Sequence, residues 1–286
     1  MRFTEVAVTG GKGGVGKSTI AILLANKLRS QGKRVVLADL DVECPNDYLL
    51  LGQSLGKPID FSFARLPKLD RDKCQKCGIC VPKCRSHAIF QAPGQYPIFL
   101  SELCSGCGLC AHLCPFGAIK MEKVRTGKIY EKKLKTQNAN SKIKSEDFYL
   151  VTGKSKELLE ETGPVVTKTR QYAEELSQKV RADYLLLDTA AGMHCSVIRG
   201  LIGVDLVMAV TEPTPLGAHD LRLILQLTNK LGLPTQIVLN QADLGKSKAI
   251  EKIAKRAAVE IKNKILYSKK IVNAYSRGRL QEINIL

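Results

Sequence analysis

Residues 6–19 read VAVTGGKGGVGKST, and this stretch decides the fold of the chain. The apolar residues 6–8 predict a buried strand, and residues 18–30 have the spacing of an amphipathic helix. Between them, residues 11–18 match the pattern G-x-x-x-x-G-K-S. Glycines in such a loop let backbone N–H groups point inward, where they bind phosphate oxygens. The order of strand, loop and helix therefore predicts a nucleotide-binding phosphate loop.

Three residues at the end of this loop carry side chains with expected roles. Lys17 is expected to bind the β- and γ-phosphates, and the Ser18 hydroxyl to coordinate a magnesium ion. Thr19 lies at the helix N-terminus, where an anion is favoured. The nucleotide-binding residues expected in the loop are Gly11, Lys12, Gly13, Gly14, Val15, Gly16, Lys17, Ser18 and Thr19.

The cysteines form an internal repeat in the middle of the chain. Eight of the ten cysteines fall into two copies of the spacing C-x2-C-x2-C-x3-C. The copies are Cys74, Cys77, Cys80 and Cys84, followed by Cys104, Cys107, Cys110 and Cys114. Because the first residues show no secretion signal and the cytosol keeps thiols reduced, the pattern favours metal binding over disulfides.

The spacing of the repeat favours iron–sulfur clusters over zinc. A zinc site is usually built from two C-x2-C pairs separated by a longer loop, and two zinc sites are the alternative. Three closely spaced cysteines and a fourth that binds the other cluster are typical of two-cluster ferredoxins. One 4Fe-4S cluster is expected on Cys74, Cys77, Cys80 and Cys114, and a second on Cys84, Cys104, Cys107 and Cys110.

The string KGGVGKST at residues 12–19 resembles the deviant P-loop of the MinD, ParA and nitrogenase iron protein family. The resemblance implies an ATPase whose two subunits face each other, with Lys12 and Lys17 among its catalytic residues and Lys12 reaching the partner's nucleotide. Asp41, in the sequence DLD at residues 39–41, would position the attacking water as part of switch I. For Asp39, a catalytic role and a loop-capping role both remain open.

Further matches to this family lie in the second half of the chain. Residues 184–188 read YLLLD, the Walker B pattern, so Asp188 is expected to hold magnesium through water, and residues 189–192 follow as switch II. Asn240 matches the adenine-contacting asparagine of the family. Cys195 is a candidate ligand of a third cluster that bridges two subunits, whereas Cys44 is more typical of a small packed residue.

Alternating elements predict an α/β fold with a doubly wound, mainly parallel sheet and a small inserted α+β ferredoxin-like domain. Further strands are expected at residues 34–38, 205–211 and 235–240, and helices at residues 165–180, 217–231 and 246–263. The expected divisions are an N-terminal ATPase part (1–64), the ferredoxin insert (65–120), a basic linker or hairpin (121–147) and a C-terminal ATPase part (148–286).

The composition of the 286 residues, 44% hydrophobic and 25% charged, is typical of a globular protein. Most of the net charge of +17 comes from residues 65–160 and 246–286. Such a surplus indicates a docking face for an acidic partner or nucleic acid, or a solvated lysine-rich surface, and the scattered positions favour the surface. No apolar stretch is long enough to cross a bilayer, and a cytoplasmic location is expected.

Three functions fit these patterns. The first is an ATPase that dimerises with nucleotide, as a homodimer or with a related ATPase, and couples this to electron transfer by two 4Fe-4S clusters. The closed cysteine spacing favours it over the second, an assembly or carrier ATPase for clusters or metals. The third is a MinD- or ParA-like positioning ATPase that binds membrane or DNA. The expected cofactors are ATP, Mg²⁺ and the clusters, and the expected partner is an acidic redox or iron–sulfur protein rather than nucleic acid.

Overall fold

A computed structural model describes residues 3–134, 148–157 and 161–283. Its centre is a nine-stranded sheet with the strand order β11-β10-β9-β1-β8-β2-β7-β6-β3. The strands from β11 to β7 run parallel to one another, whereas β6 and β3 are antiparallel to their neighbours at one edge. The expected α/β fold with a mainly parallel sheet is confirmed.

The central parallel strands arise from short, nearly continuous apolar runs, as is typical of strands buried on both faces. The parallel strands are β1 (Thr4–Thr9), β2 (Val35–Asp39), β7 (Phe148–Ser155), β8 (Tyr184–Asp188), β9 (Leu206–Thr211), β10 (Thr235–Leu239) and β11 (Ile261–Lys264). The antiparallel edge consists of β3 (Asp60–Leu69) and β6 (Ile119–Lys133). A separate two-stranded sheet is formed by β4 (Ile89–Phe90) and β5 (Ile98–Phe99).

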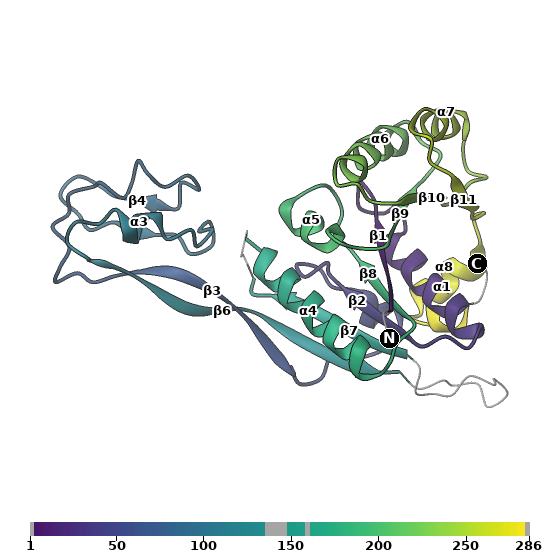
Figure 1. The fold of residues 1–286 in the computed structure, drawn as a ribbon, viewed down its shortest axis with the longest axis horizontal. Helices are drawn as coiled ribbons and strands as arrows, with labels where there is room; N and C mark the ends of the chain where they lie inside the picture. Colours follow the sequence, from purple (N-terminus) through teal and green to yellow (C-terminus); the bar gives the residue numbers. More distant parts are fainter. Residues whose placement is uncertain (1–2, 135–147, 158–160, 284–286) are drawn as a thin grey trace.

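Helices pack on both faces of the large sheet (Figure 1). The helices of the chain are α1 (Lys17–Ser30), α2 (Asp47–Leu50), α3 (Leu109–His112), α4 (Gly163–Lys179), α5 (Cys195–Leu201), α6 (Pro215–Lys230), α7 (Lys248–Ala257), α8 (Lys269–Ser276) and the 3-10 turn η1 (Leu280–Glu282). None of the helices in the described residues is long and apolar enough to span a membrane.

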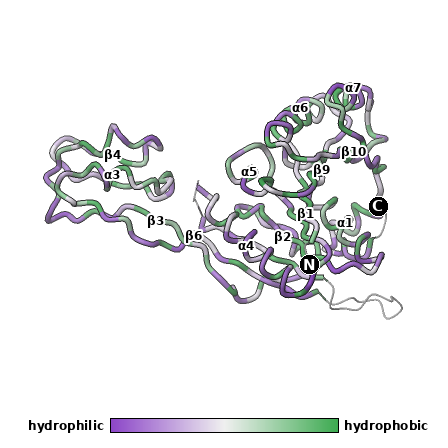
Figure 2. The backbone as a smooth tube through the Cα atoms, in the orientation of Figure 1, coloured by the Kyte–Doolittle hydropathy of each residue, from purple (hydrophilic) through white to green (hydrophobic). Residues whose placement is uncertain are grey.

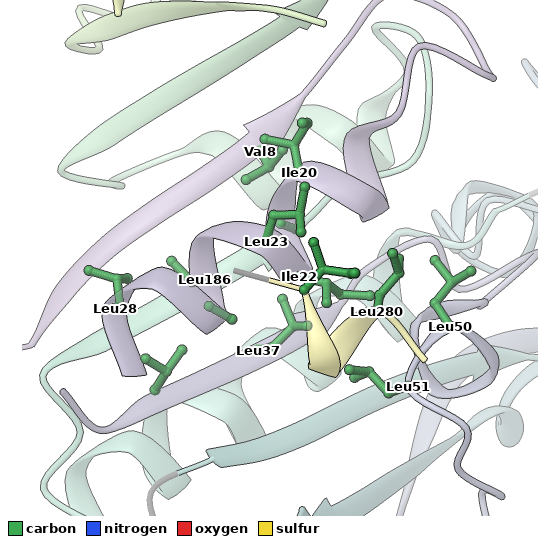
Figure 3. Close-up of a cluster of buried hydrophobic side chains, with 14 of the residues drawn as sticks. Val8, Ile20, Ile22, Leu23, Leu28, Leu37, Leu50, Leu51, Leu186 and Leu280 are labelled. Atoms are coloured by element: carbon green, nitrogen blue, oxygen red, sulfur yellow. The ribbon is translucent and has the colours of Figure 1, made fainter. Parts of the chain in front are cut away.

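Two apolar clusters hold the layers together. On one face, Ile20 and Leu23 of α1 pack with Val8, Leu37 and Leu186 of the central strands (Figure 3). On the other face, residues of α4 and α5 pack against β2 and β8. The hydropathy of the backbone follows this arrangement, with apolar residues in the central strands (Figure 2). The sheet is thus a rigid support whose carboxyl edge presents the loops after β1, β2 and β8.

The antiparallel edge extends beyond the rest of the sheet. β7 runs parallel to β2 and ends at Ser155, which pairs with Gly127 of β6. Because β6 runs in the opposite direction, its residues 119–126 continue past the carboxyl edge of the parallel strands, paired only with β3. We call residues 62–69 and 119–126 the arm, and residues 70–118 at its end the lobe (Figure 1).

Two segments of the chain differ in the structure from their expected bounds. The helix expected at residues 246–263 is wrong in its second half, because Ala258 adopts a left-handed φ of 53° after α7 and residues 261–264 form the strand β11. The expected linker at residues 121–147 begins within β6, which continues to pair with β7 as far as Lys133. The remainder, residues 135–147, lies outside the described residues.

Candidate functional site

The phosphate loop joins β1 to α1 at the carboxyl edge of the sheet. Gly14 and Gly16 have φ angles of 88° and 93°, which residues with a Cβ rarely adopt. A Cβ on Gly14 would meet nothing within 4 Å, so the loop is open on this side. α1 begins at Lys17 with no acidic residue in its first turn, so its unpaired N–H groups favour an anion. The loop therefore has the geometry of a phosphate-binding site.

The loop opens into a cleft that combines most of the expected nucleotide-binding residues with an apolar wall. Asp41 and Asn240 line this cleft together with the loop, whereas Gly11, Lys12, Val15 and Asp188 are not in its lining. The wall comes from the chain segment at α8, which the sequence analysis missed. Its lining residues from this segment are Leu266, Tyr267, Ser268, Ile271, Val272 and Tyr275.

Lys17 is held beneath the loop. Its side chain is buried, and its Nζ donates a hydrogen bond to the carbonyl oxygen of Lys12 at 3.2 Å. Burial lowers the pKa of Lys17, and the carboxylates of Asp188 and Asp41 oppose this shift. A cation placed among loop carbonyls and carboxylates is suited to bind the phosphates of a nucleotide.

Lys12 is paired within its own chain. Its Nζ lies 2.6 Å from Oε1 of Glu212, the residue after β9, and both side chains are largely shielded from solvent. The hydroxyl of Thr214 also donates to this Glu212 oxygen, at 3.1 Å. The sequence analysis missed Glu212. In this arrangement the pairing with Glu212 must break before Lys12 can reach another subunit.

Three buried carboxylates meet behind the phosphate loop. Asp39 ends β2, Asp188 ends β8, and Asp47 begins α2, and each offers an oxygen within 4.8 Å of those of the other two. Asp39 accepts hydrogen bonds from the backbone N–H groups of Asp41, Asn46 and Asp47. Among the described residues, no hydrogen-bond donor contacts either carboxylate oxygen of Asp47 or Oδ1 of Asp188.

Burial dominates the electrostatics of these carboxylates. It raises the pKa of Asp39 and of Asp47 well above the ordinary aspartate value, and the nearby Asp188 adds to both shifts. The pKa of Asp188 is raised to about 7, again by burial, although Ser18 and Lys17 oppose the shift. Buried oxygens without a donor are ligands that a hard divalent cation prefers. The residues present therefore fit Mg²⁺ near Ser18 and Asp188.

Asp41 and Asn240 border the same cleft in different ways. Asp41 is partly exposed, and burial of its carboxyl raises its pKa. Asn240 follows β10, and its side-chain Nδ2 donates to the carbonyl oxygen of Val15 at 2.9 Å. A Cβ on Gly16 would lie 2.5 Å from this nitrogen, so the close contact requires glycine there. In this structure, Asn240 fixes the phosphate loop while it faces the cleft.

The two cysteine repeats have matching backbones in the lobe. Residues with left-handed φ occur at the same places in both repeats: Lys76 and Gly106, Gly78 and Gly108, His87 and Gly117. Backbone N–H groups also point at equivalent sulfurs, from Ala88 to Cys84 at 3.3 Å and from Ala118 to Cys114 at 3.4 Å. The sequence repeat is therefore also a structural repeat.

The lobe brings the eight cysteines into two groups. Each group contains three cysteines of one sequence repeat and the fourth cysteine of the other. Cys74, Cys77, Cys80 and Cys114 line one cavity. In the other group, the thiol of Cys104 lies near those of Cys84 and Cys107, and the thiol of Cys110 near those of Cys104 and Cys107. Burial raises the pKa of Cys110 to about 11, so metal binding must displace its proton. Four thiols around a common space fit an iron–sulfur cluster.

The two remaining cysteines lie apart from the lobe. Cys195 is exposed and begins α5, next to the switch II segment, while Cys44 is exposed in the loop after Asp41. The expectation that Cys44 is a packed residue is wrong in this structure. Among the described residues, Cys195 belongs to no group of three or more close metal-ligating side chains.

Comparison with known proteins places the whole chain in a family. The sequence profile of the CobQ/CobB/MinD/ParA nucleotide-binding domain matches residues 6–281. The chain belongs to this family. Its members include the MinD and ParA P-loop ATPases, so the chain has a nucleotide-binding domain of the P-loop ATPase kind.

Relatives add detail over different lengths. The uncharacterized protein MJ0579 of Methanocaldococcus jannaschii is 35% identical over 276 residues, which cover 96% of this chain and 89% of the relative. An iron–sulfur cluster carrier protein of the same organism is 32% identical over 107 residues, 36% of this chain and 37% of the carrier. The pyruvate synthase subunit PorD of Thermotoga maritima is 44% identical over 55 residues, 19% of this chain and 56% of PorD.

Solved structures share the fold. The cell division ATPase MinD of Pyrococcus furiosus superposes with a TM-score of 0.56 at 17% identity, covering 98% of this chain and 90% of that protein. The septum site-determining protein MinD of Pyrococcus horikoshii, solved with Mg-ADP, gives 0.55 at 16% identity, with 97% and 86% covered. At these identities the likeness concerns the fold.

Proposed function

We propose that this protein is an ATP-hydrolysing iron–sulfur protein in which nucleotide-dependent dimerisation controls electron transfer by two 4Fe-4S clusters in the lobe. In this proposal, residues 65–120 are a ferredoxin domain inserted into the ATPase. One observation carries the proposal. Each group of cysteines in the lobe combines three cysteines of one sequence repeat with the fourth cysteine of the other repeat.

The small core of the lobe supports bound metal. Its buried apolar cluster consists of Cys80 and Ile89 with Ile119 of the arm, and half-buried cysteines make up much of the surrounding layer. A unit of this size rarely buries enough apolar surface to fold by itself, and metal ligation commonly supplies the missing stability. Clusters bound to the eight thiolates would join the two repeats and would supply one-electron transfer.

The nucleotide site supports the ATPase part of the proposal. Lys17 would bind the β- and γ-phosphates, while Ser18 and Asp188 would hold Mg²⁺. Asp41, at the mouth of the cleft, would orient the attacking water. Lys12, released from Glu212, would bind the nucleotide of the partner subunit. The apolar wall at α8 would lie against the adenine base, with Asn240 beside it.

A chain of backbone contacts supports coupling between the two parts. The carbonyl oxygen of Val42, next to Asp41, accepts a hydrogen bond from the N–H of Ser155 at 2.7 Å. The N–H of the next residue, Lys156, donates to the carbonyl oxygen of Thr126 in the arm at 2.7 Å. A movement of the loop after β2 would therefore reach the base of the arm. A ligand drives such a movement only if it binds the two states with different affinity.

The 107-residue likeness to an iron–sulfur cluster carrier supports a second function, in which clusters are cargo and ATP controls their transfer. The two functions differ in how long the clusters stay bound. Permanent clusters remain on the protein during incubation with an apo-acceptor and ATP, whereas cargo clusters leave it. The closed sets of four thiols favour permanent clusters.

Anaerobic purification followed by iron and sulfide analysis tests the proposal. Two four-iron clusters require about eight irons and about eight labile sulfides per chain. Two zinc ions without sulfide would refute the cluster assignment. A value near ten irons would instead support an additional bridging cluster at Cys195, which Cys195→Ala should then abolish.

A further inference from the structure

On one face of the β3–β6 pair, three successive residue pairs consist of cations and aromatic rings. Direct partners across β3 and β6 are Phe61 with Lys128, Phe63 with Arg125, and Arg65 with Lys123. Because side chains alternate between the two faces of a strand, these six residues share one face. We call the residues Phe61, Phe63, Arg65, Lys123, Arg125 and Lys128 the basic strip.

The basic strip faces away from the helical layer. Ser62 and its partner Gly127 lie on the opposite face, where a Cβ on Gly127 would meet Val165 of α4 at 2.7 Å. The four cations of the strip are exposed. Within the described part of the chain, no acidic side chain forms an ion pair with any of them. The strip is thus a positive surface whose cations have no acidic partner among the residues that the structure describes.

The aromatic rings of the strip are already in contact with its cations. Nζ of Lys123 lies 4.3 Å from the centroid of the Phe63 ring, and Cζ of Arg125 lies 5.0 Å from that of Phe61. Such contacts hold the charged groups in place over the rings. Bases of single-stranded nucleic acid need open ring faces on which to stack. The arrangement therefore favours carboxylates over bases as the bound groups.

The strip ends next to one of the two cysteine groups. A Cβ on Gly106 would lie 2.7 Å from the carbonyl oxygen of Arg65, so this loop of the lobe packs directly on the arm. The N–H of Gly106 donates to the sulfur of Cys104 at 3.4 Å. An acidic protein bound to the strip would thus lie beside the group of Cys84, Cys104, Cys107 and Cys110.

We infer that the basic strip is the docking surface for an acidic electron-transfer protein that exchanges electrons with the cluster of the Cys104 group. The inference rests on the proposed function. Weak, charge-steered interfaces of small area are typical of redox encounters. A single electron moves between the bound partner and the cluster, so that one is oxidised as the other is reduced and no bond is formed.

Binding of an acidic plant-type 2Fe-2S ferredoxin to the full, anaerobically purified chain tests the inference. The strip variant is Arg65→Glu with Arg125→Glu, and its control is Lys252→Glu with Lys255→Glu on the exposed side of α7, which changes the net charge equally. We expect the strip variant to weaken the ferredoxin affinity by about ten-fold or more and to reduce its salt dependence. The control should stay within about two-fold of the wild type.

Equal weakening in both variants, or unchanged binding in the strip variant, would overturn the inference. A single-stranded DNA oligonucleotide that binds more tightly than ferredoxin, and whose binding is lost in the strip variant, would overturn it in favour of nucleic acid. Iron and sulfide are measured on the same samples. About eight irons with strip-independent binding refutes the docking surface and leaves the proposed function standing. Strip-dependent binding without iron refutes the proposed function, and with it the electron exchange with the cluster, but leaves the docking surface standing.

Discussion

The raised pKa of Asp188 predicts that the stability of the nucleotide-free protein depends on pH. This pKa of about 7 lies above the ordinary aspartate value because the carboxyl is buried. A group whose pKa is raised in the folded state contributes its full stability at pH values below its ordinary pKa. This contribution is lost as the pH rises through the raised pKa. The free energy of unfolding should therefore fall between pH 5 and pH 8, by about 2–3 kcal/mol from Asp188 alone.

Thermal unfolding of Asp188→Asn without nucleotide or Mg²⁺ measures this contribution. The variant should show a shallower dependence of its melting temperature on pH between 5 and 8 than the wild type. Asp72→Asn, at an exposed aspartate of the lobe, is the control and should retain the wild-type dependence. An unchanged slope in Asp188→Asn would show that the carboxyl does not titrate in this range.

The ion pair with Glu212 holds Lys12 within its own chain. A partly exposed ion pair is worth up to about 1 kcal/mol, so Glu212→Gln should favour release of Lys12 and strengthen the ATP-dependent dimer by roughly five-fold. Lys12→Ala should still bind ATP but fail to dimerise. Analytical ultracentrifugation with ATP in an Asp41→Ala background measures both effects. A weaker dimer in Glu212→Gln would contradict the proposed restraint.

At the scale of elements, the exchange of cysteines between repeats gives a sharp test. Cys84 and Cys77 belong to the same sequence repeat but to different groups in the lobe, whereas Cys84 and Cys107 share a group. The double variant Cys84→Ser with Cys107→Ser should lose one cluster and keep about four irons. Cys84→Ser with Cys77→Ser should lose both clusters. Electron paramagnetic resonance and iron analysis measure how many clusters each variant keeps. If Cys84→Ser with Cys107→Ser lost both clusters and Cys84→Ser with Cys77→Ser lost only one, each cluster would belong to a single repeat.

Some of the helices and strands could be predicted from the sequence, and others could not. Apolar runs and glycine spacing were enough to predict the central strands, the phosphate loop and the α/β fold, because these depend on local pattern. The strand β11 could not be told from a continuation of the charged helix α7, since its alternating Ile-Lys-Asn-Lys sequence has no apolar run. The arm was divided between the N-terminal ATPase part, the insert and the linker, because its pairing joins residues far apart in the chain.

The candidate site was predictable only in part for a similar reason. Asp41, Asn240 and the loop residues could be predicted from motifs, and the cleft is lined by all of them except Gly11, Lys12 and Val15. Asp47 and Glu212 follow no motif, and their importance arises from contacts with residues far away in the sequence, such as Asp188 and Lys12. The apolar wall at α8 likewise depends on how the C-terminal segment folds back over the loop.

At the scale of the whole molecule, the arm projects the lobe from the edge of the sheet that carries the nucleotide site (Figure 1). In the proposed dimer, the partner subunit would approach this same edge. The backbone contacts from Val42 through Ser155 and Lys156 to Thr126 connect the loop after β2 to the arm. The central claim is therefore that closing the nucleotide site changes the environment of the clusters.

The reduction potential of the clusters, measured anaerobically with and without ATP in three proteins, tests this claim most directly. Asp41→Ala should keep its phosphate and Mg²⁺ contacts and be trapped as an ATP-bound dimer, and ATP should shift its cluster potential. Lys12→Ala should bind ATP without this shift, and Lys17→Ala should bind nucleotide weakly and behave like the nucleotide-free wild type. Identical potentials in all three variants, with and without ATP, would contradict the account and make the lobe a passive passenger of the ATPase.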